Sequence, residues 1–182
     1  MLKITNLHKT FNPGTVNAKH ALNGLNLELQ DGDFVTVIGG NGAGKSTIMN
    51  IMTGYLSLTA GEVSIDGFDI MDNPEEAKKR IGYLPEIPPL YTDMTVKEYL
   101  SFVYDLKGCK LKKDAHLDEI CEVVKIKDVY NRVIRNLSKG YRQRVGIAQA
   151  LIGNPKVVIF DEPTVGLDPK QIIEIRNLIA RL

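Results

Sequence analysis

The nine residues 39–47, GGNGAGKST, constrain this chain most, because they fit the phosphate-loop pattern G-x-x-x-x-G-K-[S/T] in full. The β-branched run before them, residues 34–38, predicts a buried parallel strand. The segment after them, residues 47–52, predicts a helix. Such a strand–loop–helix setting is the context in which this motif binds phosphate. The alternative is a glycine-rich turn with a merely exposed lysine, and the complete pattern in its full context argues against it.

Each residue type in the loop has a physical reason to meet a phosphate chain. Glycines let the backbone turn tightly and bring its N–H groups close to the anion, and the N-terminus of the following helix points at the same place. Lys45 adds a full charge near the β- and γ-phosphates, and the Ser46 hydroxyl is placed to ligate Mg²⁺. The predicted phosphate-binding residues are Gly39, Asn41, Gly42, Ala43, Gly44, Lys45, Ser46 and Thr47.

Composition narrows the class of protein. The 182 residues suffice for one domain with a core, and 23 basic against 22 acidic residues leave a net charge of +1. No bulk attraction to nucleic acid is therefore indicated, and we expect no nucleic-acid partner. No apolar run approaches the ~20 residues that span a bilayer, and the N-terminus lacks the features of a signal peptide. Cys109 and Cys121 have no metal-type spacing, which favours reduced thiols in the cytosol.

The front of the chain is predicted to be antiparallel β-structure around the phosphate-loop unit. Residues 2–7 and 20–30 alternate apolar and polar side chains, and residues 61–67 form a further strand bounded by turn residues. Pro74 then opens a short helix, and Pro85 stops a short strand that begins at residue 81.

Residues 89–137 are predicted to be a helical subdomain inserted between two parts of a core, residues 1–88 and 138–182. Thr95 and Glu98 form a capping box at the start of one helix. A second helix is expected from about residue 114 to residue 125. The expected buried faces are Val96, Tyr99, Leu100, Val103 and Leu106 on the first helix, and Leu117, Ile120, Cys121 and Val124 on the second.

Two carboxylates, Asp161 and Glu162, follow a second apolar strand over residues 156–160, at the point where a doubly wound sheet places its ligands. Such an aspartate can hold Mg²⁺ through water, and the glutamate beside it can accept a proton from an attacking water. Two acids after a strand are otherwise more often a helix cap or a turn, but the phosphate loop upstream favours the catalytic interpretation.

Over essentially all 182 residues the chain resembles the nucleotide-binding domain of ATP-binding cassette (ABC) proteins. Residues 39–47 resemble the family's Walker A motif and residues 157–162 its Walker B motif. Residues 137–143 resemble the signature usually written LSGGQ, and residues 165–168 the D-loop. The resemblance implies an α/β fold, a P-loop NTPase with an N-terminal antiparallel β subdomain, a RecA-like core and an inserted helical subdomain. It also places Phe11 against the adenine.

The resemblance further implies that two such domains pair head to tail and enclose two ATP molecules with Mg²⁺. Ser138 and Gly140 would form a second anion site at a helix N-terminus, although Ser138 also fits a plain N-cap. The implied function is the ATP-hydrolysing motor subunit of a transporter, with Lys45 and Glu162 catalytic. It would lie in the cytoplasm, peripheral on the inner face of the cell membrane, and would power a separate transmembrane permease.

The chain departs from the family pattern at three places, and the first two bear on the roles of single residues. Glu86 stands where the family usually has glutamine; it is able to ligate Mg²⁺, to couple the helical subdomain to nucleotide and partner, or simply to face solvent. Lys139 replaces the first signature glycine and Tyr141 the glutamine. Lys139 either brings charge toward the γ-phosphate or faces solvent, and we favour solvent. These variants resemble the ATPase subunits of ABC-2-type exporters.

The third departure is the end at Leu182, since family members continue with a strand and a switch histidine. His8, His20 and His116 do not fit that role. We therefore expect a C-terminally truncated cassette with a gap in its central sheet, weak ATP binding and poor hydrolysis. The alternatives are an ABC ATPase that acts on ribosomes or DNA without a membrane partner, and an ATP-binding module without catalysis.

Overall fold

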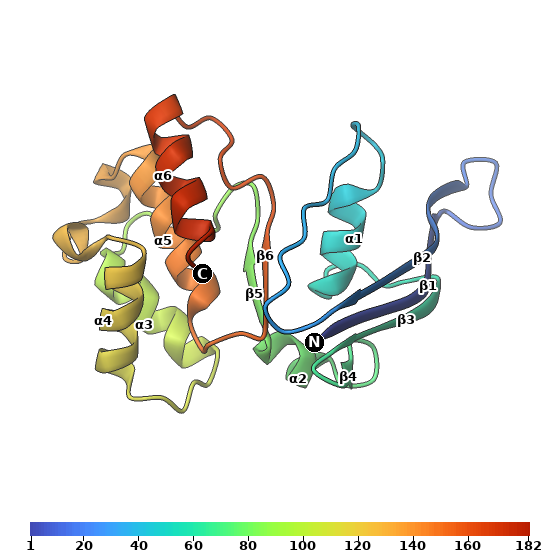
Figure 1. Cartoon of the computed structure of the whole chain (residues 1–182), viewed down its shortest axis with the longest axis horizontal. Helices are drawn as coiled ribbons and strands as arrows, with labels where there is room; N and C mark the ends of the chain where they lie inside the picture. Colours follow the sequence, from blue (N-terminus) through green and yellow to red (C-terminus); the bar gives the residue numbers. More distant parts are fainter. The chain divides into compact units, whose positions relative to one another are not determined.

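Two units make up the chain in the computed structural model, which describes residues 1–182: Met1–Ile81 and Gly82–Leu182 (Figure 1). The first unit is built on a four-stranded sheet in the order β2-β1-β3-β4. Its strands are β1 (Leu2–Phe11), β2 (Lys19–Leu29), β3 (Ala60–Ile65) and β4 (Phe68–Asp69), and the pairs β1–β2, β1–β3 and β3–β4 are antiparallel. The antiparallel front part is thus confirmed.

Alternation along the strands explains which face of this sheet is buried. Ile4 lies opposite Leu27 on one side and Val63 on the other, and Leu2 is buried with it. Leu7 is also buried, but it follows an irregularity of the register between Ile4 and Leu7 that breaks the strict alternation. Two helices belong to the same unit, α1 (Lys45–Met52) and α2 (Pro74–Lys79). α2 begins at Pro74, as predicted, with the proline in its first turn, and α1 begins at Lys45, two residues before the predicted helix of residues 47–52.

The prediction of a buried parallel strand over residues 34–38 is wrong in this structure. The segment has no strand assignment, and Phe34 and Ile38 are 75% and 88% exposed. A strand exists only where a neighbouring backbone supplies hydrogen-bond partners, and no strand pairs with these residues. The β-branched composition correctly signals extended backbone but does not specify the partner that would bury it.

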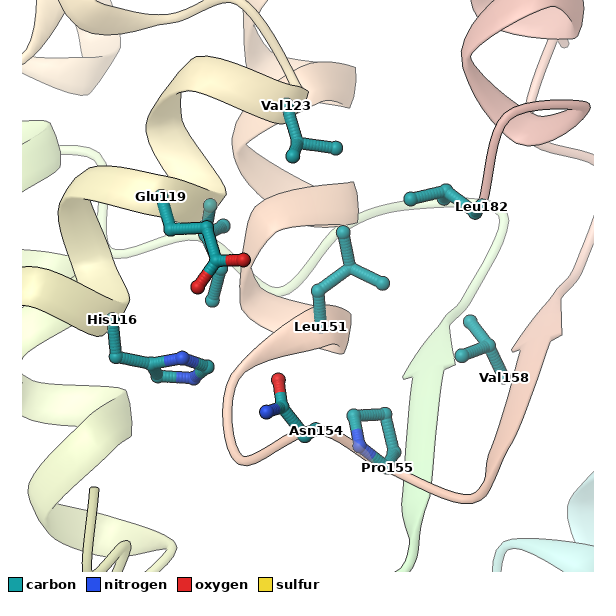
Figure 2. A pocket seen from close by; sticks show the side chains of 9 residues that line it. His116, Glu119, Val123, Leu151, Asn154, Pro155, Val158 and Leu182 are labelled. Atoms are coloured by element: carbon teal, nitrogen blue, oxygen red, sulfur yellow. The ribbon is translucent and has the colours of Figure 1, made fainter.

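The second unit combines four helices with a two-stranded sheet of β5 (Ile81–Leu84), whose first residue is the last of the first unit, and β6 (Val157–Phe160). The arrows of β5 and β6 point the same way in Figure 2, as expected for strands joined by a helical crossover. The helices are α3 (Val96–Leu106), α4 (Lys113–Val123), α5 (Lys139–Leu151) and α6 (Pro169–Ile179), with short 3₁₀ turns at Lys127–Val129 and Ile134–Asn136. No helix of the chain is both long enough and apolar enough to cross a bilayer.

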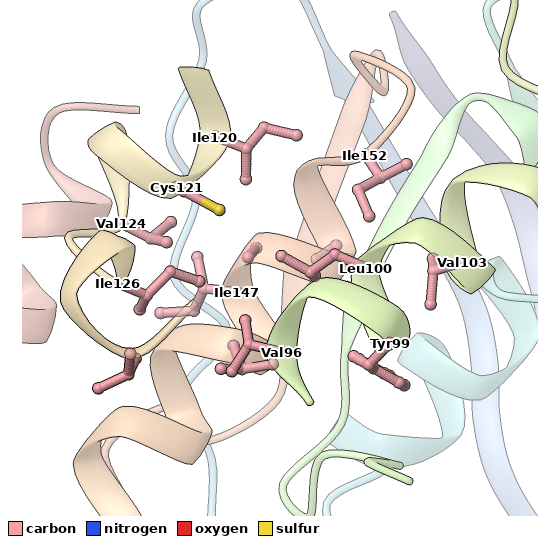
Figure 3. Close-up of a cluster of buried hydrophobic side chains, with 14 of the residues drawn as sticks. Val96, Tyr99, Leu100, Val103, Ile120, Cys121, Val124, Ile126, Ile147 and Ile152 are labelled. Carbon is pink, nitrogen blue, oxygen red and sulfur yellow. The ribbon is translucent and has the colours of Figure 1, made fainter. Parts of the chain in front are cut away.

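Side chains from α3, α4 and α5 fill the core of the second unit (Figure 3). The predicted capping box fixes the start of α3: the Glu98 N–H donates to Thr95 Oγ1 at 3.2 Å, and the Thr95 N–H donates to Glu98 Oε2 at 2.8 Å. The predicted buried faces of α3 and α4 are confirmed except at Leu106, which is 73% exposed. Leu106 is the last residue of α3, and periodicity predicts direction but not where the neighbouring helices end.

Leu100 and Leu106 offer a matched test of this core, because they lie on one helix with 0% and 73% of the side chain exposed. Leu100→Ala removes buried methyl groups and leaves a cavity, so we expect it to lower the free energy of unfolding by about 3 kcal/mol. Leu106→Ala should change it by less than about 0.5 kcal/mol. Urea denaturation followed by circular dichroism measures both, and equal losses for the two variants would contradict the packing described.

Candidate functional site

The phosphate loop turns into α1 through a glycine that no other residue replaces without cost. Gly44 is buried, with φ at +92°, and its carbonyl accepts the hydrogen bond of the Ile48 N–H at 3.0 Å. A Cβ at this position would lie 2.9 Å from the Ala21 carbonyl oxygen and 3.0 Å from Leu22 Cδ2. The left-handed backbone and the close approach of β2 therefore both require glycine here.

Lys45 folds back over the loop that precedes it. Its Nζ donates to the carbonyl oxygens of Gly39 at 2.7 Å and Gly40 at 3.0 Å, so the ammonium lies on the loop. No side chain caps α1 and no acidic residue lies in its first turn. The positive end of the α1 dipole, the backbone N–H donors of its first turn and the Lys45 ammonium thus lie together. No acidic side chain of the first turn of α1 neutralises them. In this conformation the Ala43 N–H donates to Gly40 O at 3.2 Å, and the Ser46 side chain is exposed.

Phe11 is the last residue of β1 and lies in the same unit as this loop. The Lys9 ammonium lies 5.2 Å from the centre of the Phe11 ring and donates to Ser57 O at 2.6 Å. One side of the aromatic ring is therefore in contact with a cation that is itself anchored to the backbone.

The other predicted residues lie in the second unit. The backbone N–H of Asp161 donates to Leu84 O at 2.9 Å, which continues the pairing of β6 with β5. Glu162 is exposed and has a left-handed backbone with φ at +47°. Glu86 is exposed just after β5. The predicted residues thus form two groups, one in each unit.

The start of α5 has the expected cap and an unexpected anchor. Ser138 Oγ accepts from the Tyr141 N–H at 3.4 Å, which confirms the predicted N-cap. The Tyr141 hydroxyl donates to Asp128 Oδ2 at 2.6 Å, and this hydrogen bond raises the pKa of Tyr141. Sequence reasoning missed this pair, since no local pattern links residues 13 positions apart.

The far end of α5 is also paired. Lys107 Nζ donates to the Ile152 carbonyl oxygen at 2.8 Å, and His116 Nε2 accepts from the Gly153 N–H at 3.0 Å. Burial lowers the pKa of Lys107 to about 8, so the ammonium persists at neutral pH. Burial also lowers the pKa of His116, opposed by Glu119 and assisted by Lys107. His116 therefore holds the turn after α5 as a neutral ring, because Nε2 accepts a hydrogen bond and is not protonated.

A cavity of about 290 Å³ lies beside His116 (Figure 2). Its lining is mostly apolar and includes none of the predicted site residues. The lining residues are His116, Glu119, Ile120, Val123, Leu151, Asn154, Pro155, Val158 and Leu182. The cavity is thus separate from the candidate site.

The donor set fits magnesium only in combination with phosphate oxygens. The chain has no group of three or more His, Cys, Asp or Glu side chains able to hold a metal by themselves. Mg²⁺ is commonly held by one or two protein oxygens together with substrate phosphates and water. The Ser46 hydroxyl and the Asp161 carboxylate are chemically suited to that role.

Comparisons with known proteins agree on one family. Residues 22–165 match the family described as ABC transporter. The bacitracin transport ATP-binding protein BcrA of Bacillus licheniformis is 35% identical over 182 residues, which are 100% of this chain and 57% of BcrA. The lantibiotic transport ATP-binding protein SrtF of Streptococcus pyogenes is 36% identical over 179 residues, which are 98% of this chain and 73% of SrtF.

Solved structures give the same result. The dimeric structure of MJ0796, a bacterial ABC transporter cassette, superposes with a TM-score of 0.85 at 31% sequence identity, covering 100% of this chain and 82% of that one. A second structure of MJ0796 is a post-hydrolysis state bound to ADP and Pi. This chain spans little more than half of BcrA, at 57% of its length.

Gly44→Ala should destabilise the first unit more than Gly42→Ala does. Both glycines have left-handed backbones, with φ at +92° and +81°, but an added Cβ has no neighbour within 4 Å at Gly42. We expect Gly42→Ala to cost about 1 kcal/mol of strain and Gly44→Ala about 1–3 kcal/mol more from overlap with β2. Thermal unfolding of both variants measures the difference, and equal shifts would refute the close approach.

His116 should make stability depend on mildly acidic pH. Its folded-state pKa is below the ordinary value of 6.5, so the unfolded chain binds the proton first as pH falls. The contribution of the neutral ring is complete above pH 6.5 and is lost as pH falls toward the folded-state pKa. His116→Gln keeps an acceptor for the Gly153 N–H but cannot titrate. We expect the stability advantage of the wild type over this variant to shrink between pH 7.5 and pH 5.5 in urea titrations; a constant advantage would contradict the assignment.

Proposed function

The chain belongs to the ABC transporter family, and from this membership we propose that it is the ATP-hydrolysing motor subunit of an exporter that works with a separate membrane permease. The observation that carries the proposal is the loop of residues 39–47, where Gly44 and Lys45 create an electropositive backbone cradle at the start of α1. The names of BcrA and SrtF, transport ATP-binding proteins for bacitracin and a lantibiotic, support the exporter assignment.

In the proposed reaction the cradle binds the triphosphate of ATP. Backbone N–H groups of the loop and the Lys45 ammonium hold the β- and γ-phosphates, and Phe11 stacks on the adenine. Ser46 and Asp161 would hold Mg²⁺, which when bound neutralises phosphate charge. Glu86, next to the entry of the helical part at residues 89–137, is proposed to couple that part to the nucleotide and its partner.

Glu162 is the proposed general base. The oxygen of a water molecule attacks the γ-phosphorus, the bond between this phosphorus and the bridging oxygen breaks, and Glu162 accepts the proton of the water. The products are ADP and inorganic phosphate. The exposure of Glu162 and its left-handed backbone support a role at a surface that a second subunit completes.

The second subunit is proposed to be another cassette in head-to-tail orientation. Its phosphate would meet the N-terminus of α5, where Ser138 offers a hydroxyl and Gly140 lies in the first turn without any acidic neighbour. The dimeric structure of MJ0796 supports this arrangement by analogy.

The membrane partner is proposed to dock on an aromatic surface at the start of the helical part. Tyr91 is 55% exposed and meets Phe102 edge to face, with ring centres 5.5 Å apart, and Ile87, four residues earlier in the chain, is 81% exposed. Exposed aromatic rings of this kind are typical anchors for a protein partner. The working location would be the cytoplasmic face of the membrane.

Two substitutions separate binding from hydrolysis. Lys45→Ala removes a charge from the cradle, so we expect the affinity for a fluorescent ATP analogue to fall at least about tenfold. Glu162→Gln keeps the shape but removes the base, so ATP binding should persist while phosphate release slows about 10²–10⁴-fold. Glu75→Gln on the exposed side of α2 is the control and should change neither. Unaltered binding of the ATP analogue by Lys45→Ala would contradict the proposal.

A further inference from the structure

Lys139, the residue that departs from the glycine usual in the signature, lies against the loop that follows β6. A Cβ added at Gly166 would overlap the ammonium nitrogen of Lys139 and lie 3.2 Å from its Cε. The end of this side chain therefore occupies the space over Gly166. Lys139 is exposed, as expected, and the contact of its end with this loop is an addition that the sequence did not predict.

A second contact runs in the opposite direction between the same two segments. A Cβ added at Gly140 would lie 2.8 Å from Gln171 Cδ and 2.9 Å from Gln171 Nε2. Gln171 lies in the first turn of α6, where its N–H donates to Asp168 Oδ1 at 2.9 Å. Each segment thus contributes one glycine and one long side chain that covers the other segment's glycine.

The loop between β6 and α6 needs such support. Glu162 and Gly166 both have left-handed backbones, with φ at +47° and +66°, and this conformation is strained for glutamate. The hydrogen bonds inside the loop are the Val165 N–H to Glu162 O at 3.1 Å and the Leu167 N–H to Thr164 O at 3.3 Å. Strained backbone persists where surrounding contacts determine it, and Lys139 provides one.

Stabilisation of α5 does not explain the presence of Lys139, because its positive charge lies at the N-terminus of that helix. Lys139 is the first residue of α5, and no acidic residue lies in the first turn of this helix. A cation at a helix N-terminus opposes the helix dipole. Lys139 also forms no ion pair with any carboxylate of the chain. The contact that its side chain does make is the close approach to Gly166.

We propose that Lys139 is a positioning residue, which fixes residues 163–168 and with them Glu162 to the start of α5. The inference rests on the proposed function, because the group being positioned is the proposed general base. As a consequence, two segments would move as one body. They are the start of α5, which would receive a partner's phosphate, and the loop that carries Glu162. Lys139 is thereby assigned a role through Glu162 rather than a contact with ATP.

Hydrogen exchange tests the contact without relying on activity. Lys139→Met and Lys139→Gly remove the ammonium, and we expect the Val165 and Leu167 amides to exchange about tenfold faster. The Ile126 amide, bonded to Cys121 O within the core, should not change. Lys110→Met, at an exposed lysine without a recorded contact, is the matched control. Unchanged exchange at Val165 and Leu167 in both Lys139 variants overturns the proposal, and the glycine variant decides if the methionine variant fails to fold.

A double substitution identifies the partner of Lys139. Gly166→Ala in the wild type must displace the ammonium and also strain the backbone, whereas in Lys139→Gly only the strain remains. The fall in thermal midpoint caused by Gly166→Ala should therefore be smaller in the Lys139→Gly background. Equal falls in both backgrounds would show that the two positions do not interact.

Steady-state kinetics distinguish positioning from phosphate binding. Lys139→Met should lower kcat about tenfold and leave the KM for ATP within about twofold, with Lys139→Arg restoring part of kcat. A raised KM with unchanged kcat would instead make Lys139 a phosphate contact and refute positioning. Hydrolysis that is unchanged by Glu162→Gln would refute the proposed function, while the exchange and double-substitution results would still decide the contact.

Discussion

The left-handed turn at Gly44 is the constraint on which the loop of residues 39–47 and the start of α1 depend. It lets the backbone approach β2 closely and enter α1. No side chain caps the first N–H groups of that helix. Lys45 then returns to the loop carbonyls and fills the site with its own charge. The positive potential at the site proposed to bind phosphate therefore comes first from backbone geometry and second from one side chain.

The second unit depends on α5 in a comparable way, because both ends of this largely buried helix have specific polar partners. Ser138 caps the N-terminus, and Lys107 binds carbonyl oxygens at the C-terminus. Tyr141 ties the first turn to Asp128. These contacts fix the axis of the helix, so the groups at its start are presented in a defined direction even though they are exposed.

Sequence reasoning worked best where the information is local. Alternation predicted β1 and β2, and the Thr95–Glu98 pattern predicted the start of α3. It failed where burial depends on a distant partner: residues 34–38 have the composition of a strand without a neighbour, and Leu106 has the right periodicity at a helix end. The motif residues of the candidate site could be named in advance, but the contact of Lys139 with Gly166 joins segments 27 residues apart and has no local signal.

The paired glycines at the start of α5 and in the loop before α6 have a consequence for substitutions at both places. A side chain at position 166 and a long side chain at position 139 compete for one volume, so the cost of a change at either position depends on the residue at the other. With glycine at 139 only the left-handed backbone would disfavour another residue at 166, whereas in this chain the end of Lys139 must also move aside. The signature and the D-loop are thus sterically coupled at this point, although each is usually read as an independent motif.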